Sequence, residues 1–160
     1  MTTATRSGDG SCGARRQRGV AVVEFVVTAP LVLLLVLGCA EVGRAFVHYA
    51  TLTYSVRDAG RFATEKVFNG TTQVILLSNT KITETKNLAV YGNVAGTGNA
   101  RLPNYQIGQV AVEDAGNSNI RVTATYPYQP MIGPILPGFN GSSVALNFNM
   151  QVAVTMRAIS

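Results

Sequence analysis

The feature that most constrains this chain is an apolar run from Val20 to Ala40, in which Glu24 and Thr28 are the only clearly polar residues. About 20 helical residues, each rising about 1.5 Å, cover the roughly 30 Å hydrocarbon core of a bilayer. Within hydrocarbon, a single segment satisfies its backbone polar groups internally only as a helix. The run therefore predicts one membrane-spanning helix over residues 20–40.

The charge before this run predicts its orientation. Residues 1–19 carry four basic side chains, Arg6, Arg15, Arg16 and Arg18, and the single acid Asp9. By the positive-inside rule this leader faces the cytoplasm, and everything after Ala40 lies on the opposite side. The whole chain has a net charge of +5, but the part from Val20 onward has only +2. Such a small, scattered charge argues against a nucleic-acid partner.

Glu24 is the one ionisable residue inside the run. An uncompensated carboxylate there costs at least about 2.5 kcal/mol on insertion scales. Under one interpretation Glu24, a helical turn from the basic flank, reaches back to the lipid headgroups. Under the other it has a function, and the flanking residues favour that second interpretation.

Those flanking residues are Arg18-Gly19, four small apolar residues up to Val23, then Glu24-Phe25 and an apolar helix. This order resembles the processing site of type IV-like prepilins, whose Flp subfamily has a glycine, four residues, a glutamate and an aromatic residue, usually tyrosine. The resemblance extends to the TadE-like pseudopilin family and covers nearly all of the chain. The further matching segments are Pro30, Glu41-Val42-Gly43-Arg44-Ala45, Val56 to Arg61, and Val154-Thr155-Met156-Arg157.

The resemblance implies a minor pilin or pseudopilin that acts as a structural component in assembly of a tight-adherence (Flp, type IVb-like) pilus. It implies that a prepilin peptidase cuts between Gly19 and Val20, with Glu24 and Phe25 completing the processing site. The implied location is the bacterial inner membrane, with an extracytoplasmic C-terminal domain and with entry into the pilus left open. The implied partners are sibling pseudopilins, the major Flp-type pilin and the inner-membrane assembly platform.

Glu24 is also implied to contact a neighbouring subunit, by pairing with the new amino group of Val20. Either charge alone is costly at the end of an apolar helix, so each favours the other as a partner. The two groups of one chain lie a helical turn apart, so pairing within the chain stays open as an alternative.

Cys39 supports a rival hypothesis, because Val36-Leu37-Gly38-Cys39 has the form of a lipoprotein cleavage site. The length of the apolar run and the presence of Glu24 argue against a secreted lipoprotein cut before Cys39. A third hypothesis is a membrane-tethered binding module that is never processed. The other cysteine, Cys12, lies in the leader, so no exported pair exists to form a disulfide.

Beyond the span, apolar residues recur every three or four positions and predict that the helix continues over residues 41–68. They are Val42, Ala45, Phe46, Tyr49, Leu52, Val56, Ala59, Ala63 and Val67. Arg57, Arg61 and Glu65 fall on another, solvated face. Asn69-Gly70 is typical of a helix end, which leaves residues 69–160 for an exported α+β domain.

The first part of that domain is the least determined by sequence. Val74 to Leu77 fits a strand or a short helix, and Ile82 to Tyr91 fits a helix that Asn79 could cap and Gly92 could end. Residues 92–101 are predicted to form a loop.

The second part has the period of strands. Gln109 to Glu113 and Ile120 to Tyr126 predict a hairpin around Gly116-Asn117-Ser118, and residues 144–156 predict one long alternating strand. One apolar face and one polar face indicate an antiparallel sheet covered on one side, and only the long helix offers a matching stripe. The predicted fold is therefore α+β, a long N-terminal helix packed on a small antiparallel sheet, which is the pilin-like plan.

Residues 126–141 lie between the last two strands and contain four prolines, so they are predicted to extend neither strand. The segment is nevertheless apolar. Either it folds over one end of the core, or it is an exposed patch that contacts a neighbouring subunit or the bilayer surface. The residues concerned are Met131, Ile132, Ile135, Leu136 and Phe139.

No constellation of residues predicts catalysis. The single histidine, His48, is expected to be a polar residue at the helix surface or in an interface, and the exported acids are scattered apart from Glu113-Asp114. No metal-ligand spacing or phosphate-binding loop occurs. We therefore predict a protein that is not an enzyme, needs no cofactor and has no small-molecule substrate.

Overall fold

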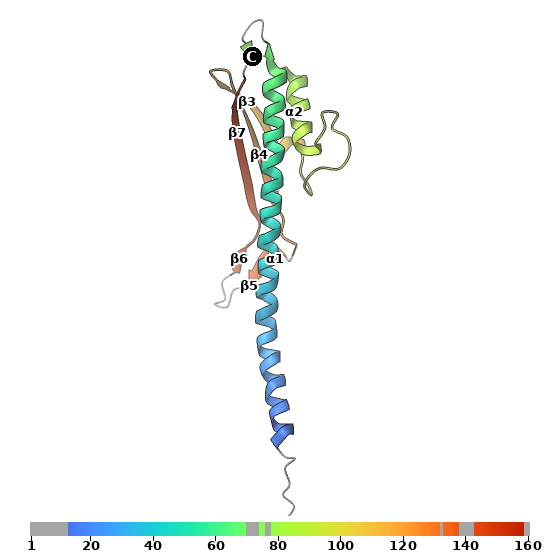
Figure 1. Cartoon of the computed structure of the whole chain (residues 1–160), viewed down its shortest axis with the longest axis vertical. Coiled ribbons are helices and arrows are strands. Elements are labelled where there is room, and N and C mark those ends of the chain that lie inside the picture. The colour runs from blue at the N-terminus through green and yellow to red at the C-terminus, as the bar shows by residue number, and fades with distance from the viewer. Residues whose placement is uncertain (1–12, 70–73, 76–77, 132, 138–142, 159–160) are drawn as a thin grey trace, which may run out of the picture. The chain divides into compact units, whose positions relative to one another are not determined.

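A computed structural model describes residues 13–69, 74–75, 78–131, 133–137 and 143–158, and the chain divides into two compact units, Met1–Ala40 and Glu41–Ser160. The predicted α+β class is confirmed: a long N-terminal helix is followed by a short second helix and a small antiparallel sheet (Figure 1). The elements are α1 (Gly13–Val67), β1 (Phe68–Asn69), β2 (Val74–Ile75), α2 (Asn79–Tyr91), the 3₁₀ turn η1 (Ile107–Gln109), β3 (Val110–Gly116), β4 (Asn119–Tyr128), β5 (Ile135–Pro137), β6 (Ser143–Ala145) and β7 (Phe148–Arg157).

Helix α1 begins earlier than the apolar pattern predicts, at Gly13 instead of Val20. Residues 1–12, with Cys12, lie outside the described part. The helix extends because Ala14, Arg15, Arg16 and Gln17 are strong helix formers. At the other end Phe68 leaves the helix and pairs with Ile75 in β1–β2, which answers the open question between strand and helix at Val74.

Helix α2 confirms the predicted helix up to Tyr91, with a different cap at its start. Ser78, not Asn79, is the N-cap, and its hydroxyl accepts a hydrogen bond from the Lys81 backbone N–H at 3.4 Å. The helix ends as predicted at Gly92, whose φ of 78° places it in the left-handed region. That region favours glycine because it has no Cβ.

The main sheet has the strand order β3-β4-β7, with both pairs antiparallel. The β3–β4 hairpin is confirmed, and its turn residues Gly116, Asn117 and Ser118 all have positive φ. β4 faces the core with alternate residues, so that Ile120, Val122, Ala124, Tyr126 and Tyr128 are all buried.

Two strand predictions are wrong. The expected strand over 144–156 is broken into β6 and β7 at Leu146, whose N–H donates to Pro134 O at 2.9 Å. The break occurs because β4 ends opposite Phe148, so that residues before it pair with β5 instead.

The second wrong prediction is that residues from Tyr126 onward, with their prolines, do not extend the strand: β4 contains Pro127 and continues to Tyr128. The β3–β4 register ends at Val110↔Ala124, whereas β4 and β7 pair as far as Tyr128↔Phe148. Beyond Ala124, β4 is thus an edge strand, where a missing N–H costs no ladder bond.

The second unit, Glu41–Ser160, is called the outer unit from here on. Its core lies between α1, α2 and the sheet. Leu52, Val56, Ala59 and Ala63 of α1 are fully buried, as their spacing predicts, and α2 adds Ala89 and Val90. Nearer the start of the unit the predicted stripe is wrong, since Val42, Phe46 and Tyr49 are exposed and Glu41 and His48 are buried in their place. The sheet is also covered by α2, which the sequence did not indicate.

Burying the Tyr105 hydroxyl in this core is energetically unfavourable. Its side chain is buried, and within the described residues its hydroxyl has no hydrogen-bond partner. Burial raises the pKa of Tyr105 to about 12, against smaller opposing effects of Ser55 and Arg101. A buried hydroxyl without a partner costs about 1–3 kcal/mol.

We therefore predict that Tyr105→Phe leaves the outer unit equally stable or raises its free energy of unfolding by up to about 2 kcal/mol. The substitution keeps the ring and its edge-to-face contact with Tyr126, whose centroid lies 5.9 Å away. Urea denaturation of the full chain in detergent, followed by circular dichroism, measures the change. A clear loss of stability would contradict the prediction and indicate a bond from Tyr105 to Ser55.

Candidate functional site

The predicted processing segment, Gly19 to Phe25, lies on α1. It contains the first residues whose side chains the structure describes. Val20 and Phe25 are 65 % and 69 % exposed, and Gly19 and Glu24 are exposed as well. Gly19, Val20, Val23 and Glu24 line one shallow surface depression. Among the described residues, a Cβ added at Gly19 would find nothing within 4 Å, so a side chain can begin there without a close contact.

This geometry makes the segment accessible but leaves it helical. A protease needs an unwound backbone, and a glycine inside a helix lowers helix stability by about 1 kcal/mol relative to alanine. Gly19 is thus the point of this turn where local opening costs least. In the described part of the chain Glu24 forms no ion pair, and its backbone carbonyl accepts a bond from the Thr28 hydroxyl at 2.9 Å.

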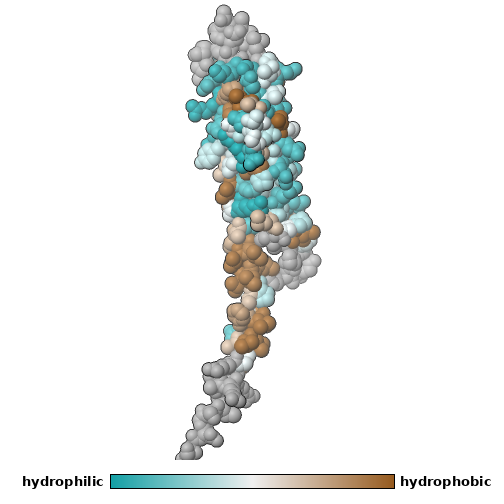
Figure 2. All heavy atoms as spheres, turned by 90° about the vertical axis from the view of Figure 1, so that its right-hand side faces the viewer, coloured by the Kyte–Doolittle hydropathy of each residue, from teal (hydrophilic) through white to brown (hydrophobic). Residues whose placement is uncertain are grey.

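In the described part of the chain, one helix is long and apolar enough to cross a membrane, the portion Gly19–Lys66 of α1. None of the residues in its apolar window is buried, whereas the core helix of a soluble protein is mostly buried. Figure 2 shows this stretch as mainly hydrophobic atoms open to the surroundings. The exposed apolar helix indicates a single-pass membrane protein.

The predicted subunit-contact segment is described only in part. Met131 and Ile135 are 78 % and 57 % exposed. Leu136 lies in β5, and Ile132 and Phe139 lie outside the described residues. The two described side chains do not fill the core, so they favour the exposed-patch hypothesis.

A buried polar cluster, which the sequence did not indicate, joins α1 to β4. Glu41 is only 6 % exposed, and its Oε1 accepts bonds from the Tyr128 hydroxyl at 2.5 Å and from the Met131 N–H at 3.1 Å. Burial, the bond to Glu41 and the Glu41 charge raise the pKa of Tyr128 to about 12. Tyr128 therefore remains a donor at all physiological pH values.

His48 is the second member of this cluster. It is 8 % exposed, so of the two expected places, the helix surface or an interface, the helix surface is wrong. Its Nδ1 lies 3.3 Å from the Tyr126 hydroxyl, which itself donates to Pro103 O at 3.0 Å. A hydroxyl has one proton, so both contacts are satisfied if Nδ1–H donates to Tyr126. Burial and the charge of Arg44 lower the pKa of His48, which keeps the ring neutral near pH 7.

The signal for this cluster was present but ambiguous. Glu41, His48 and Ser55 recur every seven residues and are all buried, and Tyr126 and Tyr128 share the core face of β4. A periodicity argument that counts only apolar residues passes over such positions. Within the described residues no group of three potential metal ligands occurs. The hydrogen bonds of the cluster hold the helix on the sheet.

We predict that Tyr128→Phe lowers the free energy of unfolding of the outer unit by about 1–3 kcal/mol, because Glu41 then keeps only the Met131 N–H. The ring contact with Phe148, at 5.3 Å between centroids, is retained. The same urea titration measures the effect, with Tyr105→Phe as the matched control for losing a tyrosine hydroxyl. Equal stabilities of the two variants would show that the Glu41 bond contributes nothing.

The comparisons with known proteins concern the helical segment. A family model described as TadE-like protein matches residues 19–61, from the predicted cleavage residue to Arg61 of α1. No curated protein and no solved structure matches the chain. The match confirms the predicted resemblance over residues 19–61, whereas the segment Val154-Thr155-Met156-Arg157, on which the resemblance also rested, lies outside it. From Gly19 to Arg61, this chain is similar to the TadE-like family.

Proposed function

We propose that this protein is a minor pilin or pseudopilin, a structural component in assembly of a tight-adherence pilus. The observation that carries the proposal is the TadE-like match that begins at Gly19 and covers an apolar helix exposed along its whole window. An exposed apolar helix attached to a small α+β unit suits a subunit that is stored in a membrane and then assembled.

The proposed precursor sits in the bacterial inner membrane with residues 1–19 in the cytoplasm and the outer unit on the far side. A prepilin peptidase cuts it between Gly19 and Val20. The proposed partners of the mature protein are sibling pseudopilins, the major Flp-type pilin and the assembly platform. The basic residues Arg15, Arg16 and Arg18 support this orientation, because they precede the apolar run directly.

Glu24 has the proposed role of pairing with the Val20 amino group of a neighbouring subunit. Its side chain is exposed on the apolar helix and has no partner of its own chain among the described residues. Cleavage would create an ammonium one helical turn away, where hydrocarbon makes each isolated charge costly. A partner helix that supplies the opposite charge removes both penalties.

The lipoprotein alternative finds less support. Cys39 is exposed and lies inside α1, which continues without a break to Val67. The TadE-like match runs through Cys39 in one segment, so it treats both sides of the rival cleavage site as one unit.

Substitution at Gly19 tests the processing step. Gly19→Leu is expected to block cleavage and leave the leader attached, because the side chain obstructs approach of the backbone to a protease cleft. Gly38→Leu is the matched control, since a Cβ at either position has nothing within 4 Å. The mass of the mature N-terminus is measured for both variants and the wild type.

The wild type and Gly38→Leu should both start at Val20. A start at Cys39 that Gly38→Leu abolishes would establish the lipoprotein, and an intact leader on the wild type would establish the unprocessed module. Either result overturns the processing proposal.

Glu24→Gln tests the assembly step, because it keeps the shape of the side chain and removes its charge. We expect normal membrane insertion, substantial processing, and recovery of sibling pseudopilins reduced at least about tenfold, which corresponds to about 1.4 kcal/mol. Glu65→Gln is the control, since Glu65 is an exposed acid of the same helix. Full recovery with Glu24→Gln would reduce Glu24 to a residue that reaches the headgroups.

A further inference from the structure

The surface of α1 just after the predicted span is the reverse of a helix on a soluble domain. Between Glu41 and Ala50 every exposed side chain is apolar, including Val42 and Phe46, at 57 % and 69 % exposure. The polar Glu41 and His48 are turned inward. An amphipathic helix in water shows the opposite arrangement.

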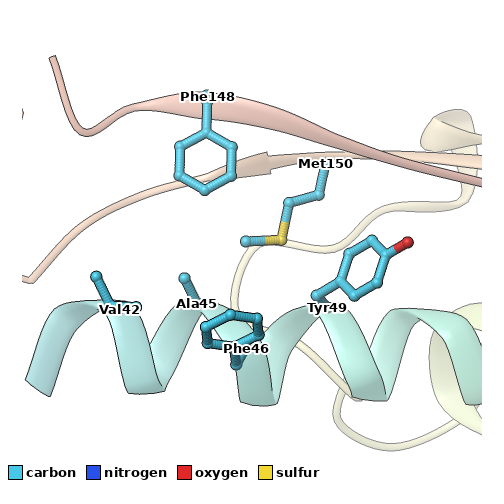
Figure 3. A pocket seen from close by; sticks show the side chains of 6 residues that line it. All are labelled: Val42, Ala45, Phe46, Tyr49, Phe148 and Met150. Atoms are coloured by element: carbon cyan, nitrogen blue, oxygen red, sulfur yellow. The ribbon is translucent and has the colours of Figure 1, made fainter. Parts of the chain in front are cut away.

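This apolar surface continues onto the sheet through a groove of about 300 Å³. Figure 3 shows Phe148 and Met150 of β7 pointing toward Val42, Ala45, Phe46 and Tyr49 of α1, which together line the groove. Phe148 is 50 % exposed at its rim.

Two further exposed apolar residues lie at the same end of the outer unit. The Met131 N–H is bonded to Glu41, and Ile135 pairs with Ala145, three residues before Phe148. In the described remainder of this unit, the large apolar side chains that are exposed are Val47 on the same turns, Tyr54 and Val94. Exposed apolar area is therefore concentrated around the first turns of α1 beyond the span.

The length of the apolar surface indicates what covers it. Val20 to Ala50 is about 46 Å of helix, and the hydrocarbon core of a bilayer is about 30 Å. With Glu24 among the cytoplasmic headgroups, the hydrocarbon would reach from about Phe25 to about Ala45. Phe46 and Tyr49 then fall in the outer headgroup layer, about 5–7 Å thick, where aromatic rings are favoured.

The inward polar cluster fits the same placement. Near hydrocarbon, polar residues face the protein interior and need partners there. Glu41 meets this condition through Tyr128 and Met131, and His48 meets it through Tyr126. Arg44, half-buried on the same turns, meets it less well, because its buried Nη1 has no hydrogen-bond partner among the described residues. Asn147 and Asn149 are exposed beside Phe148, so the end of the unit suits the headgroup layer better than the hydrocarbon.

We propose that this end of the outer unit docks on the bilayer, with the turns of α1 around Phe46 and Tyr49 in the outer headgroup layer and a band of six side chains contacting lipid. The band consists of Val42, Phe46, Tyr49, Met131, Ile135 and Phe148. The boundary between hydrocarbon and headgroups then lies one to two turns beyond Ala40. The proposal goes beyond the role in pilus assembly and rests on the membrane span, not on cleavage at Gly19.

The chain contains no tryptophan, so single-tryptophan variants report the depth of each position. The probes are Phe46→Trp and Phe148→Trp, and the control is Tyr54→Trp, which replaces a 64 % exposed aromatic residue of the same helix. Eight residues separate Tyr54 from Phe46, about 12 Å along the axis. The full chain is placed in nanodiscs of phosphatidylcholine, with or without bromine on the upper acyl carbons.

Brominated lipid should reduce the emission of the two probes at least about twofold and leave the control nearly unchanged, because bromine quenches tryptophan only at close range. Circular dichroism melts confirm folding, and Phe46→Trp decides alone if Phe148→Trp does not fold. Quenching of the probes no greater than that of the control overturns the proposal. Shielding of the probes only when a sibling pseudopilin is added also overturns it and assigns the groove to a protein partner.

Discussion

The hydrogen bond between Glu41 and Tyr128 meets the main physical constraint on this chain, which is to satisfy the first polar residues after the membrane span. A helix that leaves a membrane must change from an apolar to a polar exterior, and its first polar residues need partners before water is available. Glu41 is the first acid after the apolar run, and it is satisfied by a tyrosine of β4 and a backbone N–H at Met131. The outer unit thus provides Glu41 with the hydrogen bonds that water would otherwise provide.

Much of the local architecture follows from this requirement. Tyr126 and Tyr128 can reach α1 only because β4 runs beyond the end of β3, and Pro127 is tolerated there because that part of β4 has one neighbour. The break between β6 and β7 falls where β4 ends, which places Phe148 beside Tyr128. Three residues after Tyr128, the Met131 N–H donates the second hydrogen bond to Glu41.

The two ends of α1 have different surroundings. Around Gly19 the helix is exposed, and among the described residues no atom lies within 4 Å of a Cβ built at Gly19. From Leu52 to Ala63 it is the centre of a packed core and tolerates little change. The TadE-like match joins these regions in one segment, from Gly19 to Arg61. Membrane residence and folding of the outer unit therefore depend on the same helix.

The sequence by itself determined the features that depend on local pattern: the apolar run, the continuation of the helix, the end of α2 at Gly92 and the β3–β4 hairpin. It also determined the order of residues from Gly19 to Phe25, because a motif of consecutive residues requires no tertiary contact. The tertiary structure decided what depends on partners far apart in the chain. Glu41 and His48 are buried, whereas Val42, Phe46 and Tyr49 are exposed. The reason is that two tyrosine hydroxyl groups lie beside the buried pair: Tyr126, 78 positions from His48, and Tyr128, 87 positions from Glu41. A hydrophobic period assigns polar residues to the surface, whereas a buried hydrogen bond to a distant strand reverses that assignment.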